Sequence, residues 1–118
     1  MLGSALALAA ALLAPAPGTA GDTDADLRCL AVTTYAVDKA EGETRSQLIA
    51  AALYFVGRID ARQPGYDYQA ALTALLSDER RVRTLGDDAK RCGALLKDRG
   101  EMLQRVGAAL QARARAAK

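Results

Sequence analysis

The chain of 118 residues holds two cysteines, Cys29 and Cys92, which permit one intramolecular disulfide and no other. In the chain-entropy model, closing a loop of this length contributes roughly 4 kcal/mol, a large share of the stability of a small domain. The alternatives are two inert buried thiols or a redox pair, and the absence of a Cys-x-x-Cys spacing disfavours the redox pair. We therefore expect a fold that brings residues 29 and 92 together.

An apolar leader precedes these cysteines. Residues 1–21 carry no charge, and the apolar stretch 2–13 suits the hydrophobic region of a signal peptide but is too short to span a bilayer. Gly18 and Ala20 supply the small residues that a signal peptidase requires, which predicts cleavage after Ala20. We expect export to the periplasm, where disulfides form. The alternatives are a retained N-terminal anchor and a buried alanine-rich helix.

The composition of residues 21–118 excludes several kinds of chemistry. Histidine and tryptophan are absent, so a Ser-His-Asp or Cys-His mechanism and a histidine-ligated metal site are excluded. Asp22, Asp24 and Asp26 resemble the start of a calcium loop, but Leu27 stands at its glycine position. Helix capping and interaction with the helix dipole are the favoured roles for these aspartates. We expect no cofactor and no enzymatic activity, although carboxylates such as Asp60 or Asp67 are the candidates if the protein is an enzyme.

The pattern of apolar residues predicts an all-α domain at 21–118, a small four-helix bundle cross-linked by the disulfide. Helices are expected at 25–39, from Thr44 to the Gln63-Pro64-Gly65 stop, from a cap at Asp67 to about residue 77, and from residues 87 and 88 onward, with a short helical turn at 78–85. Thr44 and Gln47 fit a capping box. The uncharged run 48–57 predicts a central second helix, with Gly57 at a close helix crossing.

The last helix carries an apolar stripe predicted to face the core. It comprises Ala89, Cys92, Leu96, Leu103, Val106 and Leu110. Glycines recur every seven residues beside it, at Gly93, Gly100 and Gly107, and each costs about 1 kcal/mol of helix propensity. Close approach of the alanine-rich second helix at residues 50–52 is the favoured explanation, and a groove for a partner or ligand is the alternative.

Arg99 lies on the same face as this stripe, so a buried position would require a carboxylate partner. Asp60 is the favoured partner and Asp38 the second candidate. A side chain that extends along the surface to solvent, or an arginine that binds a ligand, are the other interpretations.

Charge is distributed unevenly along the chain. Residues 22–79 hold 5 basic and 10 acidic residues, a net −5, whereas residues 80–118 hold 11 and 4, a net +7. The basic residues form a cluster at Arg80, Arg81 and Arg83 and a tail at Arg113, Arg115 and Lys118. A solvated surface with complementarity between the halves is the favoured explanation. Nucleic-acid binding is disfavoured, and weak contact with an anionic membrane surface or an acidic partner fits better.

Several short strings of this chain form a recognisable set: residues 28–31 (RCLA), 52–62 (ALYFVGRIDAR), 64–65 (PG), 91–93 (RCG) and 99–100 (RG). Together they resemble small exported helical proteins of sphingomonad-type alphaproteobacteria. The resemblance covers most of residues 21–118, brings no activity with it, supports the pairing of Cys29 with Cys92, and draws attention to Arg58, Asp60 and Arg99. In size and helix content alone, the chain is also similar to periplasmic acid-stress chaperones and to small disulfide-bonded immunity proteins.

A small cross-linked helical domain without a reactive constellation is best suited to presenting a surface. The sequence therefore predicts a non-catalytic periplasmic protein that binds another protein, whose identity it does not specify. An acid-stress chaperone, an immunity or inhibitor protein, and an envelope protein that contacts anionic membrane are the alternatives. The oligomeric state is not predicted.

Overall fold

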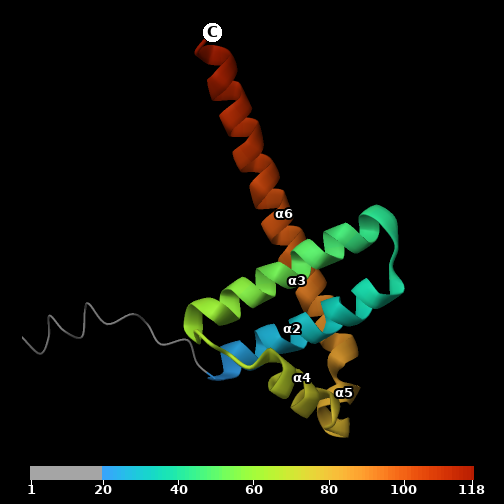
Figure 1. Cartoon of the computed structure of the whole chain (residues 1–118). Helices are drawn as coiled ribbons and strands as arrows, with labels where there is room; N and C mark the ends of the chain where they lie inside the picture. Colours follow the sequence, from blue (N-terminus) through green and yellow to red (C-terminus); the bar gives the residue numbers. More distant parts are fainter. Residues whose placement is uncertain (1–19) are drawn as a thin grey trace, which may run out of the picture.

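The computed structural model describes residues 20–118, and the predicted signal peptide at 1–20 lies almost entirely outside them. This described part is all helical, as predicted (Figure 1). Its five helices are α2 (Ala20–Lys39), α3 (Gly42–Arg62), α4 (Tyr68–Leu76), α5 (Glu79–Arg83) and α6 (Leu85–Ala116). The count exceeds the predicted four because the short turn expected at 78–85 is a helix of its own, α5.

Helices α2 and α3 form an antiparallel pair, and α4 and α5 lie beside α2 (Figure 1). Helix α6 contacts α2 and α5 and then runs out beyond the other helices, so that its red C-terminal part stands apart from them. The domain is therefore a helical pair crossed by one long helix, rather than four helices packed along their full lengths.

Two small buried clusters hold this arrangement together. Leu27, Ala31, Ile59 and Leu75 join α2, α3 and α4, with Tyr66, Tyr68, Ala71 and Leu72 packed around them. Cys29, Leu30, Phe55 and Cys92 join α2, α3 and α6, with Leu95 and Leu96 at the edge. Since both clusters include residues of α2 and α3, these two helices are the common support for the rest of the domain.

Three helix starts differ from the predictions, one of them because α6 begins at Leu85 and not at residues 87 and 88. Helix α2 already begins at Ala20, so Asp24 and Asp26 lie inside the helix instead of capping it. Helix α3 begins at Gly42, whose φ of 61° is accessible mainly to glycine, and Glu41 is its N-cap without a side-chain hydrogen bond. Thr44 is thus already within the first turn, and the predicted capping box with Gln47 is wrong.

Other local signals are confirmed. Gln63-Pro64-Gly65 follows the end of α3 at Arg62, and Gly65 adopts a φ of 78° in the turn. Asp67 caps α4, where its Oδ1 accepts a hydrogen bond from the Ala70 amide at 3.0 Å. Asp78 caps α5 in the same way through the amides of Arg80 and Arg81.

Candidate functional site

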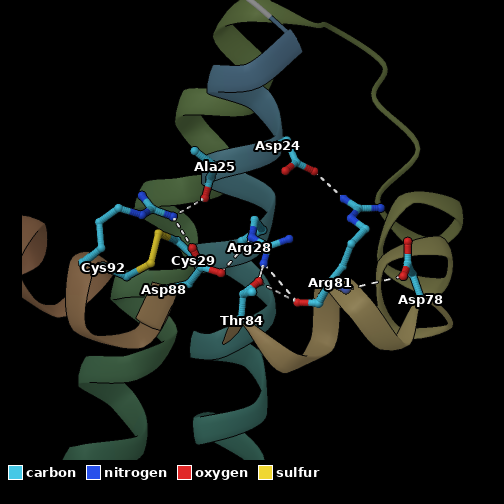
Figure 2. Close-up of polar contacts among 10 residues, drawn as sticks. Asp24, Ala25, Arg28, Cys29, Asp78, Arg81, Thr84, Asp88 and Cys92 are labelled. Carbon is cyan, nitrogen blue, oxygen red and sulfur yellow. Dashed lines mark hydrogen bonds and ion pairs between the residues drawn. A yellow bond between two sulfur atoms is a disulfide. The ribbon is translucent and has the colours of Figure 1, made fainter. Parts of the chain in front are cut away.

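The predicted disulfide is confirmed. Cys29 of α2 and Cys92 of α6 are bonded, their Cα atoms lie 5.5 Å apart, and both residues are buried (Figure 2). Helix α6 has 32 residues, all within the described part of the chain, and Cys92 is the one that is buried. The bond therefore attaches the long helix to the bundle at the point where that helix packs most closely.

The second cysteine lies beside a polar network that ties α5 and the start of α6 to α2 (Figure 2). Arg28 donates to Asp88 at 2.7 Å and to the Arg81 carbonyl at 3.0 Å, and it also contacts the Thr84 hydroxyl. Arg81 in turn pairs with Asp24. The pair of Arg81 with Asp24 fits the predicted complementarity between the basic and acidic halves of the sequence, whereas Arg28 and Asp88 each carry the minority charge of their half.

A buried carboxylate that the sequence analysis missed connects α2 to α3. Asp26 is 2% exposed and accepts hydrogen bonds from Arg58 Nε at 3.0 and 3.1 Å and from Arg62. Hydrogen bonding to Asp26, and secondarily to the Tyr54 hydroxyl, raises the pKa of Arg58. The signal was present in the sequence, because Thr23, Asp26 and Thr33 recur at helical spacing on the buried face that also carries Leu30.

This network is suited to structural support. Its carboxylates are occupied by guanidinium groups, and every buried side-chain nitrogen and oxygen of the described residues has a hydrogen-bond partner. Residues 20–118 contain no group of three or more acidic or cysteine side chains that could hold a metal ion.

The predicted pair between Arg99 and Asp60 is wrong. Arg99 is 44% exposed and pairs with its neighbour Asp98 at 2.7 Å, a contact that raises its pKa. Asp60 instead accepts a hydrogen bond from the Tyr68 hydroxyl of α4. The physical reason is the crossing of α6 over the middle of α3, which places Arg99 beside the first half of α3 and leaves Asp60 facing α4.

The close helix crossing at the glycines is also absent. A Cβ atom built on Gly57, Gly93, Gly100 or Gly107 would have no heavy atom within 4 Å. The helix crossing is formed instead by the disulfide, Phe55, Leu95 and Leu96. Of the two explanations for the repeating glycines, the structure rejects close backbone approach.

An apolar groove opens where α3 and α6 diverge from this crossing. Its volume is about 570 Å³, and its surface is predominantly apolar. Helix α3 contributes Thr44, Gln47, Leu48, Ala50, Ala51 and Tyr54, and helix α6 contributes Leu96, Arg99, Gly100 and Leu103. Thr44 and Gln47, predicted to cap a helix, thus line the α3 wall of the groove, and Arg99 and Gly100 line its α6 wall.

Beyond the groove, the apolar stripe of α6 continues into solvent. Leu103 is 64% exposed, Val106 46% and Leu110 63%. The prediction that these residues face the core is wrong, because α6 leaves the bundle before it reaches them (Figure 1). They form an unpartnered apolar face instead, which we call the arm stripe.

The basic residues do not form a single free patch. Arg81 is paired with Asp24, and Arg83 Nη2 lies 3.6 Å from Glu79 Oε2. Arg80 is exposed. Arg113 and Arg115 lie exposed in the last turn of α6. Of these five arginines, Arg113 and Arg115 lie on α6, the helix that carries the arm stripe, whereas the other three lie on α5.

A second apolar hollow of about 460 Å³ lies on another side of the domain, among α2, α4, α5 and α6. Tyr35, Leu76 and Val82 border it and are themselves exposed. No charged side chain lines it. The Tyr35 hydroxyl is therefore the one polar side-chain group of this lining that could orient a ligand.

Comparison of the chain with protein-family models, with curated proteins and with solved structures found no match. Among the described helices, none has both the length and the apolar character required to cross a membrane.

Proposed function

We propose that residues 1–20 direct export and that residues 21–118 form a non-catalytic periplasmic domain that binds another protein through the groove between α3 and α6 and the adjoining arm stripe. The observation that carries the proposal is the continuity of these two features, because Leu103 belongs to both. Single exposed leucines are common on protein surfaces, but a groove that continues into an unpartnered helix face is typical of interaction sites.

Stable binding requires that a partner contact both the groove and the arm stripe. Burying the exposed parts of Leu103, Val106 and Leu110 would contribute roughly 3 to 4 kcal/mol, which is no larger than the lowest estimates of the cost of association. The groove supplies further apolar surface on both of its walls. A partner that fills the groove and covers the arm stripe is therefore expected to bind with moderate affinity.

Photo-crosslinking tests this proposal. A photoreactive amino acid in place of Leu103 should yield a defined adduct with a protein from the envelope of the producing cells. The same amino acid in place of Ala108, which is exposed on the far side of α6, should not. Adducts of equal intensity at both positions, or none at Leu103, would contradict the proposed surface. Intact mass of the exported protein, expected to begin at Gly21, tests the signal peptide separately.

A further inference from the structure

The arm stripe has an arginine at each end. Arg99, Leu103, Val106, Leu110 and Arg113 follow one another at steps of four, three, four and three, which is the a/d spacing of a coiled-coil seam. The two arginines are 14 positions apart, so about 21 Å of helix separates them. Arg99 lines the groove and Arg113 lies in the last turn of α6.

A second copy of α6 is a poor occupant of this seam. Residues 102–118 contain four basic residues, Arg105, Arg113, Arg115 and Lys118, and no acidic residue. In a parallel pair, each stripe arginine would face its own counterpart. In an antiparallel pair centred on Val106, Arg99 would face Arg113. Both registers place like charges opposite each other, which is unfavourable.

A membrane surface is a poor occupant as well. A helix that lies in a bilayer interface carries its cations on the face opposite its apolar residues. Here Arg99 and Arg113 stand in line with the leucines, where they would be driven toward the acyl chains. The described part of α6 also contains no aromatic residue. Moreover, the groove is concave and formed by two helices, a shape that accepts a helix better than a flat surface.

We propose that the partner presents an acidic amphipathic helix to this protein, with apolar side chains that cover the groove and Leu103, Val106 and Leu110, and with carboxylates near Arg99 and Arg113. This inference rests on the proposed protein-binding function and names the chemistry of the partner. Such a helix places a carboxylate opposite each arginine. Self-pairing would instead place a second arginine there, so the acidic helix turns a repulsion into an attraction. Arg99 would exchange its contact with Asp98 for an intermolecular one.

Two synthetic helical peptides of four heptads provide the test. Both carry leucine at the a and d positions, and the flanking e and g positions hold glutamate in one and lysine in the other. Fluorescence anisotropy at low salt measures their binding to the disulfide-bonded domain, residues 21–118. The glutamate peptide should bind at least roughly tenfold more tightly than the lysine peptide, and added salt should reduce the difference.

Matched variants identify the contacts. Arg113→Gln and Arg99→Gln should each weaken binding of the glutamate peptide by roughly two- to fivefold. Arg115→Gln removes the same charge from another face of the last turn and should leave binding unchanged. Leu103→Asp should abolish binding. All four residues are exposed, so the variants should retain the helical circular dichroism of the unmodified domain.

Several outcomes would overturn the inference. Equal binding of the two peptides would reject the acidic partner while leaving the protein-binding surface in place. Failure of both peptides to bind, or binding only to vesicles of anionic lipid, would also reject it. Concentration-dependent dimerisation that is lost in Leu103→Asp would show that a second copy occupies the stripe. Crosslinking at Leu103 tests the proposed function independently of all these results.

Discussion

Replacing the glycines of α6 by alanine tests the helix crossing directly. Gly93, Gly100 and Gly107 lie inside a helix, and a Cβ atom at each would meet no other group. Alanine is better than glycine in a helix interior by about 0.8 to 1 kcal/mol. No steric cost offsets that gain here. We therefore expect alanine to stabilise the helix at all three positions.

The location of each glycine decides which measurement detects the gain. Gly93 follows the disulfide-bonded Cys92, where α6 is held against α2, so this turn melts only when the domain unfolds. Gly93→Ala should raise the free energy of unfolding by about 1 kcal/mol, and the melting temperature by roughly 4 to 8 °C. Gly107 lies among exposed residues that can fray without unfolding the domain. Gly107→Ala should leave the melting temperature nearly unchanged.

Urea denaturation followed by circular dichroism measures the first effect. Hydrogen exchange of the amides around residue 107 measures the second, and these amides should exchange roughly fivefold more slowly in Gly107→Ala. Gly65→Ala is the matched control and should destabilise the domain, because Gly65 has a φ of 78°. A destabilised Gly93→Ala protein would refute the reasoning, since it would mean that another helix approaches Gly93 closely.

Three further predictions concern the polar and covalent contacts. Reduction of the disulfide should destabilise the domain by roughly 4 kcal/mol, measured by urea titration with and without reductant. Asp26→Ala should cost about 3 kcal/mol because two guanidinium groups lose their partner, and adding Arg62→Met should recover part of the loss, whereas additive losses would reject the coupling. Burial, followed by the hydrogen bond to Asp60, raises the pKa of Tyr68 from 10.0 to about 12. The associated stability should be complete below pH 10.0 and decline toward pH 12, and a phenolate absorbance titration in which Tyr68 ionises at its usual value of 10.0 would contradict this.

Local features of the fold could be predicted because their causes are local. Asp67 satisfies an amide three residues away, and the Pro64-Gly65 turn ends α3 through its own backbone preferences. The disulfide could be predicted from the number of cysteines, since two cysteines permit one pairing. The capping box at Thr44 failed for an equally local reason, because Gly42 allows α3 to begin two residues earlier than Thr44.

The candidate site could not be predicted in the same way, because it depends on the angle between helices. The stripe from Ala89 to Leu110 has the same spacing whether it packs or projects into solvent. Its burial stops after Leu96 because α6 crosses α3 instead of running along it. Periodicity identifies the apolar face of a helix, but it does not show how far along that face a neighbouring helix extends.

The charged residues of α6 have different surroundings before and after its crossing with α3. Where α6 lies against the bundle, Arg28 and Asp88 pair across it, and Arg91 donates to the Ala25 carbonyl. Beyond the crossing, the ion pairs of α6 lie within the helix itself, between Lys97 and Glu101 and between Arg99 and Asp98. Residues 102–118 hold four basic residues and no acidic residue, so the C-terminal part of α6 carries an excess of positive charge. An intramolecular partner for Arg113 would require α6 to bend back, whereas an acidic helix from another protein would require no change in the fold.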